Sequence, residues 1–123
     1  MNWDDVSDFG INKAVAKLQG HKCYYGDDSF TNGSMGDSVA VKGKNIVGAI
    51  DYCKHWDVTG PLISDNDITI TPIYYSDCKT WCAGGDYNVL KKAINPKAHN
   101  ENPLRAAAIV YLMMNGVKAE DCK

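Results

Sequence analysis

One uninterrupted apolar segment near the end of the chain constrains the fold more than any other feature. Every residue from 106 to 114 is apolar or aromatic, so in a helix these side chains would cover the whole circumference. Asn102 is a suitable N-cap, Pro103 fits the first helical position, and Gly116 can adopt the left-handed conformation that ends a helix. The segment is too short to span a bilayer, which needs about 20 apolar residues. We therefore predict a buried core helix between Pro103 and Gly116.

The length and composition of the chain indicate one domain. With 123 residues, of which 45% are hydrophobic, the chain can bury one sizeable core, and we predict a single domain over residues 1–123. A formal net charge of -2 provides no field that would attract nucleic acid or an anionic membrane. No signal peptide of the usual type opens the chain, so we expect a cytoplasmic protein. Its five cysteines are an odd number, and we expect free thiols.

Periodicity predicts a second helix and several short strands. Residues 7–20 carry apolar side chains at helical spacing on one face, with Asn12 among the polar residues of the opposite face. Alternating side chains predict strands over residues 38–42, 46–52, 67–71, 73–75 and 80–83. The first two strands are expected to form a hairpin around a turn at residues 43–45, and Pro72 is expected at the end of a strand or at a sheet edge.

The remaining segments complete a fold-class prediction. Residues 53–66 are expected to be irregular, with a helical turn after Pro61 at most, and residues 87–94 to form a short helix. The order of helix, short strands and helix predicts an α+β domain. In this domain, a small antiparallel sheet is covered on one face by the N-terminal amphipathic helix and the buried C-terminal helix.

Several segments of the sequence resemble one family of phage proteins. They are SDFGINKAVA at residues 7–16, DYC with Trp56 and GPLI within residues 51–63, DITI at residues 67–70, WCA at residues 81–83, and NPLRAAAIVYLMM at residues 102–114. In this order they resemble the NinX-like family, small proteins from the accessory region of lambda-type phages and their prophages. The resemblance does not extend over residues 26–36 and 41–49. It implies a phage-derived protein that acts in a bacterial cytoplasm and is dispensable for building the virion, and it carries over no catalytic residues.

Local pairs of cysteine and histidine are the first candidates for chemistry. They are His21 with Cys23, Cys53 with His55, and Cys78 with Cys82. None has the Cys-x2-Cys spacing usual in zinc sites, and in a strand Cys78 and Cys82 would lie about 13 Å apart. We therefore predict no bound metal and no cofactor. In a strand Cys53 and His55 would point to the same side about 7 Å apart, but no cysteine-hydrolase signature surrounds them.

Glycine-rich stretches at residues 33–36 and 42–44 lie near lysines. Neither stretch has the Gly-Lys-Ser/Thr sequence that leads into a helix in a P-loop, nor the dinucleotide-binding pattern of glycines after a strand. We expect solvated loops at both places.

Aromatic side chains give the clearest indication of a binding surface. Residues 24–25 and 74–75 are adjacent tyrosine pairs, and neighbours in a strand face opposite sides. One tyrosine of each pair should then lie on the sheet face that the helices leave open, unless these rings wrap the edges of a small core. Tyrosine and tryptophan are favoured at interfaces because they bury a large area at a small entropic cost. The candidate partner-binding residues are Tyr25, Tyr52, Trp56, Tyr75, Trp81 and Arg105.

The sequence carries no specific catalytic motif, so we predict a non-enzymatic protein that binds a host or phage protein, with inhibition of a host defence as the specific expectation. The alternative is a pocket for a small anionic ligand such as a signalling nucleotide, with an aromatic ring on the base and Arg105 or a lysine at the phosphates. Arg105 would instead pair with a carboxylate if its role is structural. A third hypothesis, an enzyme or metal protein, would use Cys53 and His55 or the cysteine pairs.

Overall fold

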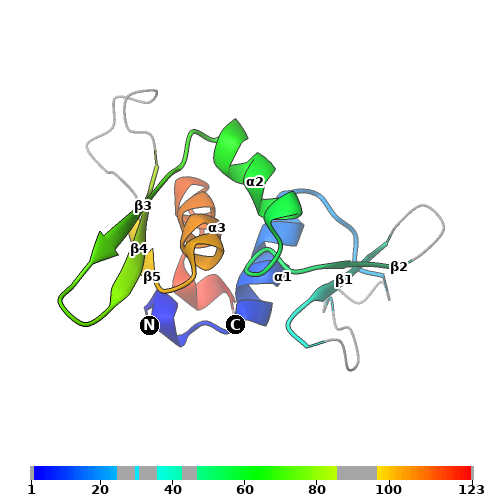
Figure 1. Ribbon diagram of the computed structural model, residues 1–123. Coiled ribbons are helices and arrows are strands. Elements are labelled where there is room, and N and C mark those ends of the chain that lie inside the picture. The colour runs from blue at the N-terminus through cyan, green and yellow to red at the C-terminus, as the bar shows by residue number, and fades with distance from the viewer. Residues whose placement is uncertain (1, 25–29, 31–35, 43–46, 86–96, 123) are drawn as a thin grey trace.

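The computed structural model describes residues 2–24, 30, 36–42, 47–85 and 97–122. Its helices are the 3-10 helix η1 (Trp3–Asp5), α1 (Asp8–Leu18), α2 (Trp56–Asp65), α3 (Pro103–Met114) and the 3-10 helix η2 (Ala119–Cys122). Its strands are β1 (Val39–Lys42), β2 (Val47–Ile50), β3 (Thr69–Tyr74), β4 (Lys79–Gly84) and β5 (Lys97–Asn100). Figure 1 shows α3 in the middle, with β3, β4 and β5 on one side and α1 and α2 on the other.

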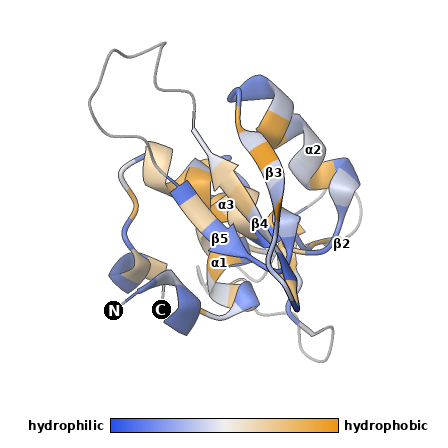
Figure 2. Ribbon diagram, turned by 60° about the vertical axis from the view of Figure 1, so that its left-hand side comes forward, coloured by the Kyte–Doolittle hydropathy of each residue, from blue (hydrophilic) through white to orange (hydrophobic). Residues whose placement is uncertain are grey.

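Helix α3 forms the centre of the hydrophobic core, as the sequence predicts. Every residue from 104 to 110 is buried, and Leu112 is fully buried. The Asn102 side chain caps the helix by accepting hydrogen bonds from the backbone amides of Leu104 and Arg105, and Gly116 follows the helix with a φ of 78°. Figure 2 shows hydrophobic residues concentrated on α3, where the sheet and the other helices surround it. Packing on all sides is the physical reason for a helix without a polar face.

The α+β class is confirmed, and the strands form two antiparallel sheets where the sequence analysis expects one. Strands β3, β4 and β5 make a three-stranded sheet in that order, and β1 pairs only with β2 among the strands described. Helix α3 packs against β4 and β5, whereas α1 contacts α3 and β1. The sheets are separate because α2 carries the chain from β2 past α3 before β3 begins (Figure 1).

Residues 56–65 form helix α2, although the sequence predicts an irregular segment over residues 53–66. The helix contains Pro61 in its interior, where a proline costs about 3 kcal/mol through a lost hydrogen bond and a steric clash. Tertiary contacts offset this cost: Leu62 is buried, and the hydroxyl of the fully buried Thr59 donates to the carbonyl oxygen of Tyr52 at 2.5 Å. Local sequence therefore predicts a helix breaker where long-range packing stabilises a helix.

The two predicted strands around Pro72 form one strand, β3, which pairs with β4 in register from Thr69 opposite Gly84 to Tyr74 opposite Lys79. Strand β3 lies at an edge of its sheet, as expected for a strand with an internal proline. Strand β5 was not expected from the sequence. The turn predicted at residues 43–45 and the helix predicted at 87–94 lie outside the described residues.

Asn12 of α1 is buried, although helical periodicity places it on the polar face. Its side-chain oxygen accepts hydrogen bonds from the backbone amides of Tyr52 at 2.7 Å and Cys53 at 3.3 Å. Its side-chain nitrogen donates to Asp51 Oδ1 and to the carbonyl oxygen of Asp37, each at 2.9 Å. Because α1 contacts both α3 and β1, more than one of its faces is covered, and a polar residue there needs internal partners.

Candidate functional site

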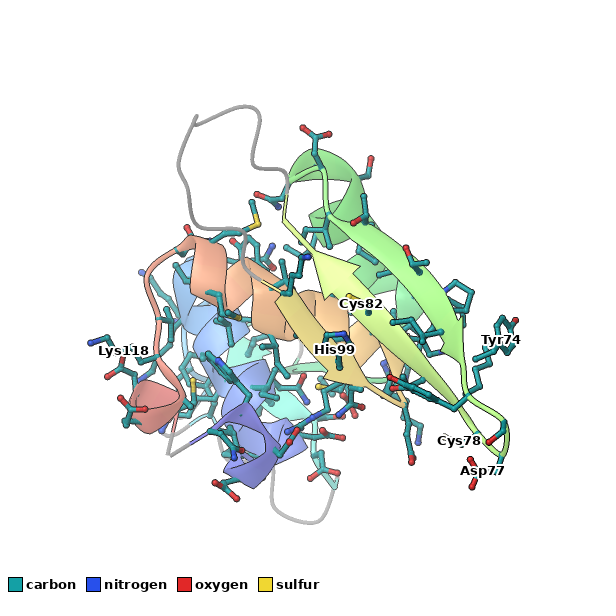
Figure 3. The ribbon with its side chains drawn as sticks, turned by 90° about the vertical axis from the view of Figure 1, so that its left-hand side faces the viewer. Tyr74, Asp77, Cys78, Cys82, His99 and Lys118 are labelled. Atoms are coloured by element: carbon teal, nitrogen blue, oxygen red, sulfur yellow. The ribbon has the colours of Figure 1, made fainter. Side chains whose placement is uncertain are left out.

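The strongest candidate surface lies on the β3–β4 hairpin. Its four residues are Tyr74, Tyr75, Lys79 and Trp81, which we call the hairpin patch. Tyr74 and Tyr75 are 71% and 59% exposed, and Trp81 is half-buried. Figure 1 shows the β3–β4 turn extending away from the helices, and Figure 3 shows Tyr74 near the end of the hairpin with Asp77 and Cys78.

The β-sheet register explains why these side chains meet. Tyr74 lies directly opposite Lys79, and Trp81 follows Lys79 by two residues, which puts all three on one face of the sheet. Lys79 Nζ is 5.5 Å from the centre of the Tyr74 ring and 4.6 Å from the centre of the Trp81 ring. An exposed cation–π contact is worth about 0.5 to 1 kcal/mol. The ammonium group therefore lies against two aromatic rings on this face of the hairpin.

Tyr74, Lys79 and Trp81 lie on the α3 side of the sheet, whereas Tyr75, the residue after Tyr74, points to the open side, where the sequence predicts an aromatic surface. Ala83 follows Trp81 by two residues in β4 and is fully buried against the core, so Trp81 and Ala83 face the same way. The patch is accessible because its residues lie toward the turn, at the end of the hairpin that extends away from the helices (Figure 1).

The other aromatic candidates in the described part of the chain, Tyr52 and Trp56, lie away from the hairpin patch. Tyr52 is 1% exposed, and its hydroxyl donates to Gln19 Oε1 at 2.7 Å, so its ring is part of the core and not of a surface. Trp56 is 54% exposed but is the first residue of α2, on a different element from the hairpin patch. Tyr25 lies outside the described residues. Of the aromatic candidates in the described part of the chain, Tyr75 and Trp81 lie on the same hairpin, but Tyr75 follows Tyr74 directly and so points away from the face that Tyr74 shares with Trp81.

Arg105 has a structural role in this arrangement. It is 9% exposed, and it forms an ion pair with Asp8. Its second terminal nitrogen donates to the carbonyl oxygens of Trp3 at 3.0 Å and Val6 at 2.6 Å. The guanidinium group satisfies internal acceptors, as in the carboxylate pairing considered from the sequence, and it is not presented to an external anion.

The Cys53 and His55 pair is not arranged as a nucleophile and base. Cys53 is 1% exposed, whereas His55 is an exposed residue at the start of α2. Burial raises the pKa of the Cys53 thiol far above its ordinary value, and the nearby carboxylate of Asp8 raises it further. The thiol therefore stays protonated and enclosed. All five cysteines lie in the described part of the chain and are thiols, none of them in a disulfide, as the sequence predicts.

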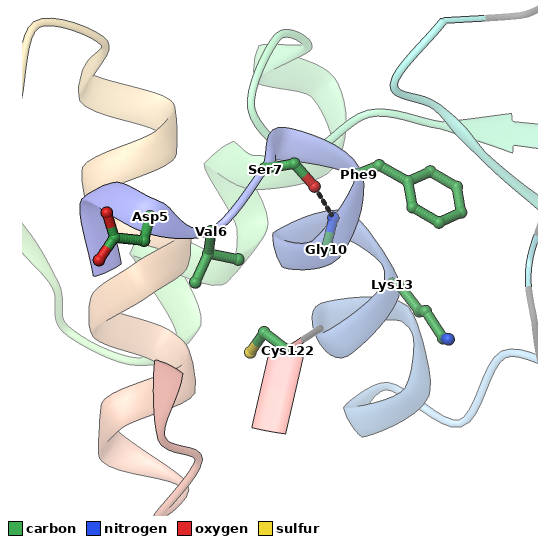
Figure 4. Close-up of a pocket in the computed structure, with 7 residues that line it drawn as sticks. All are labelled: Asp5, Val6, Ser7, Phe9, Gly10, Lys13 and Cys122. Carbon is green, nitrogen blue, oxygen red and sulfur yellow. Dashed lines mark hydrogen bonds between the residues drawn. The ribbon is translucent and has the colours of Figure 1, made fainter. Parts of the chain in front are cut away.

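A small pocket lies at the start of α1, with a volume of about 270 Å³. Figure 4 shows its lining residues: Asp5, Val6, Ser7, Phe9, Gly10, Lys13 and Cys122. Ligand pockets usually measure about 300 to 1,000 Å³, so this one is small. The charged groups that line it, Lys13 and Asp5, have opposite signs, so the pocket has no set of converging cations that would select a phosphate. Burial raises the pKa of the Cys122 thiol that also lines the pocket, with a contribution from Asp121.

Tyr74 and Lys79 are the members of the hairpin patch that are not among the candidate residues predicted from the sequence, which include only Tyr75 of the tyrosine pair. Lys79 is the one without any aromatic signal. Its two-residue spacing from Trp81 was visible in the sequence, but its place opposite Tyr74 depends on the turn that sets the hairpin register. A lysine two residues before a tryptophan in a predicted strand is the signal that could have pointed to it.

The family comparison covers nearly all the elements described above. The family described as Bacteriophage P22, NinX, matches residues 2–115. The chain belongs to this NinX family. The match confirms the resemblance noted in the sequence, and the NinX range includes α1, the whole hairpin patch and α3. A search of curated proteins finds no match. Among the described residues of this NinX-family chain, no helix has the length and apolar character needed to cross a membrane.

Proposed function

We propose that this NinX-family protein is a non-enzymatic binding protein whose hairpin patch contacts a host or phage protein. One observation carries the proposal: Tyr74 and Tyr75 are 71% and 59% exposed at the end of the hairpin, and Lys79 Nζ lies over the Tyr74 and Trp81 rings. Folding does not require large aromatic side chains on the surface, since their contribution to stability comes from burial. A partner that covers them would recover that contribution.

The composition of the hairpin patch favours a protein partner. Residues that dominate binding energy at protein interfaces are enriched in tyrosine and tryptophan, which combine a large apolar area with a polar group. Because Lys79 already contacts the Tyr74 and Trp81 rings, their arrangement exists before binding, and less entropy is lost when the partner docks. Asp77 at the exposed turn adds a polar group to the rim of the patch.

Site-specific photo-crosslinking in bacterial host cells tests this proposal. A photoreactive phenylalanine analogue replaces Tyr75 in one variant and Tyr24 in another; Tyr24 is 44% exposed and lies outside the hairpin. We expect a discrete crosslinked product from position 75 and none of the same mass from position 24. The same products at both positions, or none at position 75, would count against the proposal.

A second set of variants measures the contribution of each side chain once the partner is purified. Truncating a hot-spot aromatic residue at an interface costs about 2 kcal/mol or more, so Tyr74→Ala and Tyr75→Ala should each weaken binding about thirtyfold or more. Lys79→Ala should weaken binding through the loss of ring positioning. Lys54→Ala, a change to an exposed lysine outside the patch, should leave the affinity unchanged.

As the specific form of this function, we propose that the partner is a host defence protein in the bacterial cytoplasm, which the protein inhibits. Membership in a phage family supports this form. The test is the plating efficiency of a restricted phage on cells that produce the chain. It should rise with the native chain and stay low with Tyr74→Ala, and equal efficiencies would remove the inhibitor role while leaving the binding test intact.

A further inference from the structure

Cys82 of β4 and His99 of β5 lie directly opposite each other in the three-stranded sheet. The next paired residues, Ala83 and Ala98, are buried in the core, so Cys82 and His99 project from the other face of the sheet. Figure 3 shows both side chains on that face. Cys82 is half-buried and His99 is exposed, and neither belongs to the hairpin patch.

This pair has the chemistry and the spacing of zinc ligands. Opposed residues on one face of an antiparallel sheet have Cβ atoms about 4.5 to 5.5 Å apart. From that separation a cysteine sulfur and a histidine ring nitrogen can approach one zinc ion at about 2.3 Å and 2.0 Å. Because the two ligands come from different strands, no short sequence motif contains both of them.

One chain supplies only half of a tetrahedral site. Within the described residues, no group of three or more His, Cys, Asp and Glu side chains is placed to hold a metal ion, whereas structural zinc takes four ligands. We propose that Cys82 and His99 form half of a zinc site that two copies of this chain complete. The copies meet with these sheet faces together, and each gives one thiolate and one imidazole.

The surroundings of the pair suit a second copy. Thr71 lies beside Cys82 in the register, Thr69 and Gly84 form the row on one side, and Ile73 and Thr80 form the row on the other. None of these β3 and β4 side chains is charged, so two sheets can approach each other here without burying a charge from these two strands. A two-fold axis through the metal repeats each contact on both copies. Two thiolates balance the charge of Zn²⁺, so the enclosed site carries no net charge. Lys97 is the one charged residue that β3, β4 and β5 place on this face, and it is exposed on an edge strand, where its ammonium group can reach water.

Titration of the metal-free chain with Co²⁺ and Zn²⁺ tests the proposal. Co²⁺ in a tetrahedral site with thiolate ligands gives intense visible bands, which we expect to saturate at one ion per two chains and to disappear when Zn²⁺ displaces it. Light scattering should show that Zn²⁺ doubles the molar mass and that a chelator reverses the change. Absence of the bands, or one ion per chain without a change in mass, would overturn the proposal.

Matched variants show whether Cys82 and His99 hold the metal. Cys82→Ser and His99→Ala should each abolish the Co²⁺ bands and the dimer, while thermal unfolding shows that both variants remain folded. Cys78→Ser and His55→Ala change an exposed cysteine and an exposed histidine elsewhere, and they should retain both signals. Equal losses in the two groups of variants would contradict the assignment.

Discussion

The guanidinium group of Arg105 in α3 donates a hydrogen bond to the carboxylate of Asp8 in α1, which joins the first and last α-helices across 97 positions of sequence. The same side chain also donates to the carbonyl oxygens of Trp3 and Val6. The N-terminal segment is therefore attached to the core helix through one buried cation.

Replacing Arg105 should destabilise the fold strongly. Arg105→Ala leaves the Trp3 and Val6 carbonyl oxygens without this donor and removes the partner of Asp8. We expect the free energy of unfolding to fall by about 2 to 4 kcal/mol, the usual cost of breaking a buried charged network. Arg105→Lys keeps the charge but loses the planar fork, so it should recover less than half of the loss in urea denaturation.

The Asp8→Asn variant provides the matched control for this network. The Asp8 side chain is 37% exposed, so solvent screens much of its interaction with Arg105. The expected loss is about 1 kcal/mol or less. A loss as large as that of Arg105→Ala would show that the ion pair, and not the carbonyl contacts, dominates.

Asn12 should also be sensitive to substitution. Asn12→Ala removes an acceptor from the backbone amides of Tyr52 and Cys53 and a donor to Asp51. Since buried groups would remain unsatisfied, unfolding should require about 2 to 4 kcal/mol less. Lys17→Ala changes an exposed residue of the same helix and should stay within about 0.5 kcal/mol of the native chain. Similar thermal unfolding of both variants would refute the network role.

Two glycines in helices should respond differently to alanine. A Cβ at Gly10 would clash with the carbonyl oxygen of Cys122, so Gly10→Ala forces α1 and η2 apart and should destabilise the protein despite a better helix propensity. Gly60 of α2 has nothing outside its chain neighbours within 4 Å of its Cβ position, but it directly precedes Pro61, whose Cδ crowds a Cβ on the preceding helical residue. This crowding offsets the gain in helix propensity, so Gly60→Ala should change the free energy of unfolding by less than about 0.5 kcal/mol. Chemical denaturation of the two variants measures both changes.

Alkaline pH should destabilise the protein through two buried acids. Burial raises the pKa of the Cys53 thiol above its ordinary value of 9.0, with a further contribution from Asp8. Burial, with a smaller effect of Tyr111, raises the pKa of Tyr52 from 10.0 to about 12. Above their ordinary pKa values both groups ionise in the unfolded chain while they stay neutral in the folded chain. The stabilisation from these two neutral groups is therefore fully present below pH 9. As the pH rises, the free energy of unfolding falls by about 1.4 kcal/mol per pH unit for each group, starting at the ordinary pKa of that group.

Variants at these two positions separate the contributions. Relative to the native chain, Cys53→Ala should flatten the fall in unfolding free energy from pH 9 upward. Tyr52→Phe should leave the part between pH 9 and 10 unchanged and flatten the part between 10 and 12. Parallel curves for all three proteins would mean that neither group remains neutral in the fold.

The candidate surface was only partly predictable from the sequence. Exposure of one member of the tyrosine pair followed from alternation, and Tyr75 is exposed as expected. The side of the sheet was not predictable, because it depends on which strand residues α3 covers. Tyr52 shows the same limit: an aromatic residue after a strand has no local signal that separates a core position from a surface position.

The sequence by itself determined the buried α3 helix, its Asn102 cap and the mixed α+β class, because an unbroken apolar run and a capping side chain act through neighbouring residues. The tertiary structure alone decided the burial of Asn12, the helical state of the segment around Pro61, and the meeting of Cys82 with His99. Each of these depends on segments far apart in the chain. Their contacts are fixed by packing and strand register, which local sequence does not specify.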